Sequence, residues 1–414
     1  MAILKAFKGI RPVSDKAAPI ASLPYDVYNR AEAFKEAEGN PLSFLHVIKA
    51  EIDLPDSIDE HDPEVYRKGN ANFRKMIADG VFITDDSDKL YVYAQTMGER
   101  TQYGIVGCAS VDDFKNNVIR EHELTRPDKV EDRKNHIRVS NVNYGPVFLA
   151  YPAVAEIDNF VAKITTLPAE YDFTTGDGIR HQLWVVSDTA TIVRIIELFA
   201  AIPNTYVADG HHRTAAAVQV SDERRLADPN HTGNEEYNYF LAVHFPDNQL
   251  KIMDYNRVVK DLNGHSETDF LKELEKGFAV QCKGTDEYRP AALHEFSMYL
   301  GGKWYALTAL PGTYNDDDPI GCLDVTVLSD LVLAPLLDIT DLRNSTRIDF
   351  VGGIRGLGEL KRRVDSGEMA VAFALYPVSM KQLIDIADTG NIMPPKTTWF
   401  EPKLRSGLVV HSIL

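Results

Sequence analysis

The spacing of apolar and polar residues predicts short helices and a β-hairpin in the first hundred residues. Asn29, with Glu32 at the third helical position, predicts a capped helix over residues 30–38. Runs rich in Tyr, Val and Ile cover residues 90–97 and 101–109, on either side of a short polar turn. This arrangement is typical of a β-hairpin and predicts the first part of a core sheet.

The rest of the chain alternates strand-like and helix-like patterns. Further helices are predicted over residues 63–79, 191–201, 214–226, 268–276, 329–337 and 379–389. Strands are predicted over residues 205–208 and 239–244, and the intervening residues 121–135 are a polar stretch. The mixture indicates an α/β (α+β) fold with a mixed sheet and several domains.

Length and composition fit a globular protein of two or three domains. The chain has 414 residues, of which 44% are hydrophobic and 25% charged. We expect an N-terminal α+β region over residues 1–112, a central domain over 113–250 and a C-terminal α+β domain over 251–414.

Charge and cysteine content narrow the function classes. The formal net charge of −17 disfavours nucleic acid as a partner, because DNA and RNA would be repelled. The three cysteines lie far apart and form no zinc-like pair, so a reduced, cytoplasmic setting is expected. No apolar run is long enough to cross a bilayer, so no membrane partner is expected. Homo-oligomerisation is compatible with the sequence.

The densest group of chemically active residues is Asp209-Gly210-His211-His212-Arg213, between a predicted strand and a predicted helix. Glycine lets the backbone turn sharply, and the first N–H groups of a helix attract anions. The segment is therefore a candidate phosphate site, with Asp209 as a candidate Mg²⁺ ligand. The alternative is that Asp209 only caps the helix and the histidines fill space.

Two weaker clusters lie far from this segment. Glu121-His122-Glu123-Leu124-Thr125, followed by Asp132-Arg133, offers Glu123 as a general base, but such a cluster is also typical of a solvated acidic turn. Pro395-Lys396-Thr397-Thr398 offers a lysine and two hydroxyls to phosphate, or forms a packed C-terminal turn.

Taken together, the three clusters resemble the free L-serine kinases of the ParB/sulfiredoxin superfamily. The wider pattern, with Pro24-Tyr25-Asp26-Val27, residues 40–44 and Ser406-Gly407-Leu408, resembles the longer bacterial relatives known only as a domain of unknown function. The second resemblance extends over nearly the whole chain. The first resemblance implies that residues 113–250 form a ParB/sulfiredoxin-like catalytic core, with the C-terminal domain closing the site.

The resemblance also implies roles for individual residues. The implied catalytic residues are Glu123, as the base that accepts the serine hydroxyl proton, Asp209 and His212. The implied phosphate- or nucleotide-binding residues are Gly210, His211, Arg213, Thr214, Lys396, Thr397 and Thr398. The implied substrate-binding or supporting residues are His122, Thr125, Asp132 and Arg133.

The resulting expectation is a phosphotransferase that converts free L-serine into O-phospho-L-serine. Its partners would be a small amino acid and a nucleotide, and its cofactors would be Mg²⁺ and a phosphoryl donor that is ATP, ADP or pyrophosphate. The alternative is a non-catalytic sensor of ParB-like fold that binds a nucleotide or amino acid. ParB-like DNA binding, a third option, conflicts with the acidic charge.

Overall fold

Two compact units organise the chain in the computed structural model, which describes residues 1–414. Unit 1 contains residues 1–121, 125–250 and 402–414, and unit 2 contains residues 122–124 and 251–401. The border expected at residue 112 falls within unit 1, because strands on both sides of it pair in one sheet. Residues 402–414, expected in a C-terminal domain, belong to unit 1.

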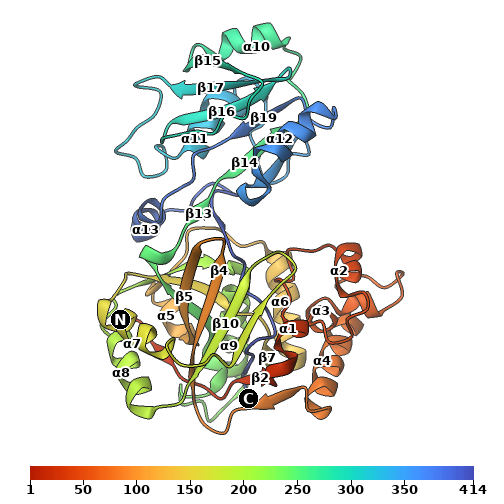
Figure 1. Cartoon of the computed structure of the whole chain (residues 1–414), viewed down its shortest axis with the longest axis vertical. Coiled ribbons are helices and arrows are strands. Elements are labelled where there is room, and N and C mark those ends of the chain that lie inside the picture. The colour runs from red at the N-terminus through yellow and green to blue at the C-terminus, as the bar shows by residue number, and fades with distance from the viewer. The chain divides into compact units, whose positions relative to one another are not determined.

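Unit 1 is built on a nine-stranded mixed sheet (Figure 1). Its strands, in sheet order, are β6 (Ile119–Arg120), β11 (Thr205–Asp209), β8 (Val147–Tyr151), β12 (Tyr239–Pro246), β5 (Arg100–Ser110), β4 (Leu90–Met97), β10 (Arg180–Val186) and β9 (Tyr171–Thr174), with β1 (Leu4–Lys5) paired to β5. The β11–β6 and β12–β8 pairs are parallel, and the others are antiparallel. The mixed α/β class predicted from the sequence is confirmed.

The helices of unit 1 bury the sheet residues in separate hydrophobic clusters. One cluster packs α7 (Ala155–Ile164) and α8 (Thr189–Phe199) against β4. A second packs α6 (Pro127–Ser140) and α9 (His211–Ala227) against β8, β11 and β12. The remaining helices of the unit are α1 (Ala17–Ile20), α2 (Arg30–Ala37), α3 (Leu45–Ile48), α4 (Pro63–Ala78) and α5 (Val111–Lys115). Burial of these apolar side chains holds α6 and α9 beside the strands that carry the candidate site.

Short strand pairs hold both ends of the chain within unit 1. β2 (Ile10–Pro12) pairs with β3 (Phe82–Thr84), and β21 (His411–Ser412) pairs with β7 (Val142–Asn143). Backbone hydrogen bonds also join Ser406 to Ser22. These contacts bring residues 402–414 next to the N-terminal helices.

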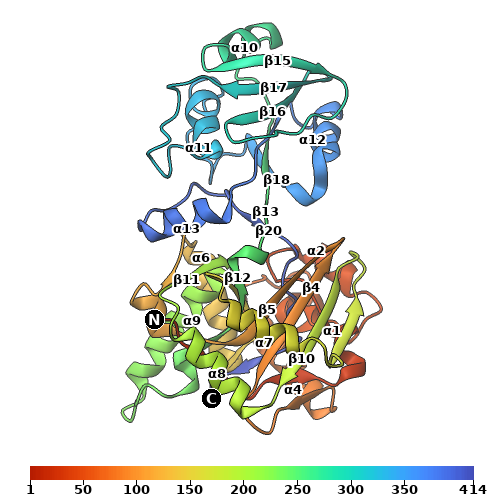
Figure 2. The same cartoon turned by 60° about the vertical axis from the view of Figure 1, so that its left-hand side comes forward.

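Unit 2 has a six-stranded antiparallel sheet (Figure 2). In sheet order the strands are β15 (Phe278–Gly284), β17 (Lys303–Ala309), β16 (Glu295–Leu300), β19 (Val371–Ala374), β14 (Tyr255–Val259) and β18 (Ile348–Gly352). Its helices are α10 (Glu267–Leu274), α11 (Asp324–Leu328), α12 (Gly356–Asp365) and α13 (Met380–Asp388), and β13 (Ile252–Met253) pairs with β20 (Trp399–Phe400).

Most elements predicted from local patterns are present. The capping box at Asn29 and the β4–β5 hairpin are confirmed, and the helix predicted over residues 379–389 is present with a capping box at Ser379. Two predictions differ from the structure. The polar stretch that includes residues 127–135 is largely helix α6, and the helix expected at 329–337 is replaced by α11 followed by a π-helical turn over Ser329–Leu333.

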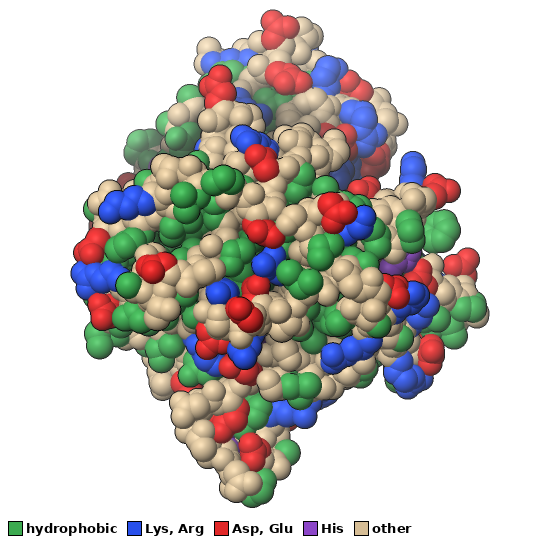
Figure 3. Space-filling model, turned by 60° about the horizontal axis from the view of Figure 1, so that its bottom comes forward, with side chains coloured by type: hydrophobic (Ala, Val, Ile, Leu, Met, Phe, Trp, Pro, Cys, Tyr) green, Lys and Arg blue, Asp and Glu red, His purple; other side chains and the backbone are tan.

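The face shown in Figure 3 carries acidic and basic side chains interspersed with apolar ones. No helix combines the length and the apolar character needed to cross a membrane. The three cysteines are all free thiols.

Candidate functional site

The turn between β11 and α9 is shaped to expose a helix N-terminus. Gly210 has φ of +98°, a left-handed conformation that side chains other than glycine adopt at a cost. A Cβ atom at this position would lie 3.0 Å from Arg213 Nε. Gly210, at the N-cap position of α9, has no side chain that could cap the helix, and the N-terminus of a helix attracts anions.

Asp209 links two cations at this turn. Its Oδ2 accepts from Arg213 Nη2 at 2.7 Å, and its Oδ1 accepts from Lys403 Nζ at 3.3 Å. Burial raises the pKa of Asp209, but Lys403 and Arg213 outweigh that effect and hold the pKa well below its usual range. Two positive groups therefore flank one carboxylate.

The two histidines of the turn have different surroundings. His211 is buried, and its interaction with Asp209 further lowers the pKa of that carboxyl. His212 Nε2 accepts a hydrogen bond from the backbone N–H of Arg126 at 3.1 Å. The ring of His212 thus holds the residue that precedes α6, which makes it a positioning residue in this structure.

Thr214 contributes its hydroxyl to the helix itself. The side chain is fully buried and its Oγ1 donates to the Gly210 carbonyl at 3.2 Å. It supports the first turn of α9, and in this structure its hydroxyl faces the backbone.

Asp132 and Arg133 lie on α6. Asp132 Oδ2 accepts from Arg133 Nε at 3.0 Å, and Oδ1 accepts from the Tyr66 hydroxyl at 3.0 Å. Burial raises the pKa of Asp132, but Arg133, His136 and these hydrogen bonds lower the pKa by more than burial raises it. The carboxyl is therefore ionised. Thr125, half-buried, lies two residues before α6.

Unit 2 brings two of the predicted clusters together. His122 Nε2 is 3.0 Å from Thr398 Oγ1, and the His122 carbonyl accepts from the Met393 N–H at 2.8 Å. The turn that contains Lys396 therefore packs against His122. Glu123, beside His122 in sequence, is half-buried.

Two side chains of that turn differ in their surroundings. Thr397 Oγ1 donates to the Pro394 carbonyl at 2.6 Å, whereas the Lys396 side chain is exposed. The Lys396 carbonyl accepts from Arg257 Nη2 at 2.9 Å. Arg257 is fully buried, and its burial lowers its pKa to about 10.

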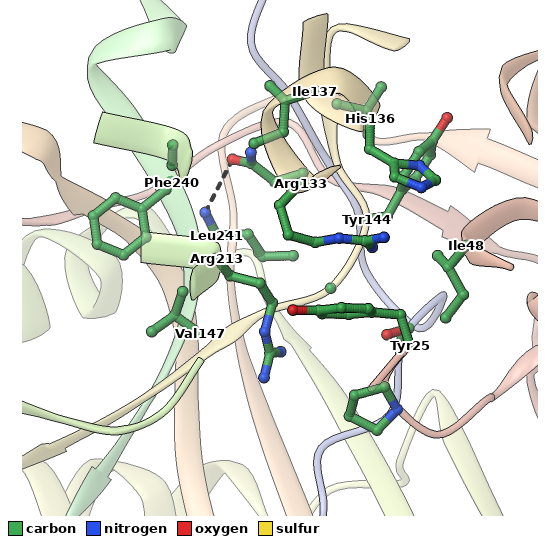
Figure 4. A pocket seen from close by; sticks show the side chains of 16 residues that line it. Tyr25, Ile48, Arg133, His136, Ile137, Tyr144, Val147, Arg213, Phe240 and Leu241 are labelled. Atoms are coloured by element: carbon green, nitrogen blue, oxygen red, sulfur yellow. Dashed lines mark hydrogen bonds between the residues drawn. The ribbon is translucent and has the colours of Figure 1, made fainter. Parts of the chain in front are cut away.

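Sequence patterns did not identify several residues of these clusters. Lys403 and Arg257 have no motif around them. Tyr25 and Ser406 lie in segments that supported the family resemblance but carried no assigned role. Figure 4 shows Tyr25, Arg133 and Arg213 together at one cavity of unit 1, although they come from distant parts of the chain.

The structure offers no preassembled metal centre. No group of three or more His, Cys, Asp or Glu side chains could hold a metal ion in residues 1–414. Both oxygens of Asp209, the predicted Mg²⁺ ligand, already face cations.

Comparisons with known proteins identify a family and distant structural likenesses. A family model described as "Protein of unknown function (DUF1015)" matches residues 4–326. No curated protein matches the chain. Among solved structures, a free serine kinase in complex with AMP is 13% identical, with 74% of this chain and 91% of that chain covered and a TM-score of 0.33.

Two further solved structures show similar values. A conserved hypothetical protein from Pyrococcus furiosus is 15% identical, with 74% of this chain and 95% of that chain covered and a TM-score of 0.33. SbnI with a C-terminal truncation, from Staphylococcus aureus, is 13% identical, with 74% and 87% covered and a TM-score of 0.36. All three are distant likenesses.

Proposed function

This chain belongs to the DUF1015 family, and we propose that it is a phosphotransferase that phosphorylates the hydroxyl of free L-serine. The product would be O-phospho-L-serine, and the donor ATP, ADP or pyrophosphate. The motif resemblance supports this function, and we place the reaction at the β11–α9 turn.

One observation carries the proposal, namely the anion site at the start of α9. The N-terminus of α9, Arg213 and Lys403 converge there, with Asp209 between the two cations. Phosphoryl transfer depends mainly on positioning and on neutralising phosphate charge, which these groups can supply. Asp209 acts as a positioning residue that orients both cations.

The chemical step needs a base for the hydroxyl proton. In the proposed reaction the serine Oγ attacks the terminal phosphorus, a new O–P bond forms, and the bond between phosphorus and the donor's bridging oxygen breaks. The electron pair of the broken bond leaves with the shortened donor. Glu123 accepts the hydroxyl proton, and His122, held by Thr398, positions the adjacent Glu123 backbone.

No step of the proposed reaction uses Mg²⁺. A metal bound at Asp209 would have to displace Arg213 or Lys403 from a carboxylate oxygen, so the residues present do not fit the expected Mg²⁺ role. Protein cations and backbone N–H groups balance the phosphate charge instead.

The direct test incubates purified full-length protein with L-serine and, separately, ATP, ADP or pyrophosphate, each with and without Mg²⁺. Phosphoserine is measured by mass spectrometry. We expect product with one donor. Binding of a nucleotide without product in any tube would overturn the kinase assignment and favour the sensor.

Glu123→Gln tests the base. We expect donor binding to persist and turnover to fall by about 10²-fold or more, because a glutamine cannot accept the proton. Glu99→Gln is the matched control, since Glu99 is exposed at the β4–β5 turn. A Glu123→Gln variant with the control's rate would remove Glu123 from the mechanism.

A further inference from the structure

Two adjoining cavities in unit 1 extend from Arg213, which the proposed chemistry uses, to residues that it does not use. The inner cavity, of about 50 Å³, reaches Arg213 and Ser406, and the outer cavity, of about 300 Å³, reaches Lys49, Glu60 and other charged groups. Both are lined by Tyr25, Ile48, Arg133 and His136. These four residues therefore form the boundary between the two spaces.

Arg133 is held rigidly at this boundary. Its guanidinium carbon lies 3.6 Å from the centre of the Tyr25 ring, and Figure 4 shows the two groups stacked face to face. Its Nε and Nη2 donate to Asp132, while no hydrogen bond uses Nη1. A guanidinium whose side chain is only 11% exposed and that has one unused nitrogen is suited to an anionic ligand.

Two other buried polar groups face the same space without a hydrogen bond. The Tyr25 hydroxyl has no protein partner, and Figure 4 shows it directed toward the guanidinium of Arg213. The His136 ring, in a residue that is 7% exposed, has none either. Burial raises the pKa of Tyr25 and lowers that of His136, so both groups are neutral and each retains a proton to donate.

Buried polar groups are normally satisfied, and a cavity that gathers three unused donors indicates that a ligand completes them. Donors without a competing acceptor favour an oxyanion. The choice between phosphate and carboxylate follows from the charge.

The two cavities carry opposite charge. The inner one is lined by the cations Arg133 and Arg213, each of which is paired with one carboxylate, Asp132 or Asp209. Because each guanidinium is already partly neutralised, a monoanionic carboxylate matches this cavity better than a phosphate dianion. The outer cavity has the opposite balance: its remaining charged residues are Asp26, Lys49, Glu51, Glu60 and Lys129, with one more acid than base.

We propose that this pair of cavities binds a free α-amino acid, with the carboxylate at Arg133 Nη1 and the Tyr25 hydroxyl and the ammonium group toward the acidic outer cavity. This inference rests on the proposed function, whose acceptor it defines as a zwitterion rather than any small alcohol. Tyr25, from the N-terminal segment, then contributes directly to substrate selection.

The test measures binding by calorimetry to the full-length protein without donor. We expect L-serine to bind, and serinol, which lacks the carboxylate, to bind at least tenfold more weakly. Inorganic phosphate and acetate serve as probes of anion class, and acetate should compete with L-serine where phosphate does not. Equal affinity for L-serine and serinol, or competition by phosphate alone, would overturn the carboxylate assignment.

Two variants locate the site. Tyr25→Phe keeps the stacked ring and removes only the hydroxyl, so L-serine affinity should fall by about tenfold. Arg133→Met combined with Asp132→Asn removes the guanidinium without leaving a buried unpaired carboxylate, and binding should be lost. The control is Arg180→Met, which breaks an exposed pair with Asp172. Unchanged affinity in a folded Tyr25→Phe protein would refute the site.

The same experiment separates the two proposals. If L-serine binds in an Arg133-dependent manner but no donor yields phosphoserine, the subsite stands and the kinase function fails. If phosphoserine forms and Tyr25→Phe leaves kcat/KM unchanged, the function stands and the subsite fails.

Discussion

Asp324, buried in unit 2, should make the stability of this protein depend on pH. The side chain lies at the start of α11 and is 3% exposed. Its Oδ1 accepts from the His294 N–H at 2.9 Å, whereas Oδ2 is buried without a hydrogen-bond partner. The His294 ring bridges Asp324 and exposed Asp316 and stacks on Tyr314.

The size of the pH effect on folding stability follows from the pKa of this carboxyl. Burial raises the pKa of Asp324 from 3.8 to about 7. The folded state therefore keeps a proton that the unfolded chain releases above pH 3.8. The contribution of Asp324 to the free energy of unfolding is at its maximum below that pH. It falls by about 1.4 kcal/mol per pH unit until the folded carboxyl ionises near pH 7. The total loss is ~4 kcal/mol.

Asp324→Asn removes this dependence because the amide stays neutral at every pH. We expect the variant to match the wild type near pH 4 and to be more stable by up to ~4 kcal/mol at pH 8. Urea denaturation at several pH values, followed by fluorescence, measures the difference. Asp317→Asn, an exposed carboxylate in the same acidic loop, is the control.

Two outcomes would refute this reasoning. A variant less stable than the wild type at pH 8 would show that the ionised carboxylate is favourably paired. A pH-independent difference between the two proteins would show that Asp324 titrates alike in the folded and unfolded states.

Two further predictions concern the β11–α9 turn. Gly210→Ala should cost ~1–2 kcal/mol of backbone strain and displace Arg213, so donor binding measured by calorimetry should weaken by about tenfold; Gly233→Ala, with a similar φ of +94° and no atom within 4 Å of the added Cβ, should keep full affinity. Equal affinity in both variants would contradict the contact with Arg213. Asp209→Asn should destabilise the fold by up to ~3 kcal/mol at pH 7, because two half-buried cations lose their carboxylate. Since the pKa of Asp209 is lowered by folding, this difference should be present above about pH 4 and shrink as the pH falls further, and a urea midpoint difference that persists unchanged at acid pH would count against it.

The sequence alone determined the features that depend on neighbours a few residues away. The capping box at Asn29, the hairpin around residues 98–100 and the strand-to-helix turn at Gly210 follow from local hydrogen bonds and backbone preferences. Helix α6 was not predicted because charged residues occupy half of its 14 positions, and its buried face is defined only when it packs against α9 and α4.

Only the tertiary structure decided which side chains complete the site. Lys403 reaches Asp209 across 194 residues, and Thr398 reaches His122 across 276. Tyr25 stacks on Arg133, and His212 is turned to the backbone of Arg126. Such contacts depend on strand pairing and on burial of distant apolar surfaces, which place the groups at hydrogen-bond distance whatever their separation along the chain. Local patterns record which chemical groups are available, and packing of the complete fold determines which of them meet.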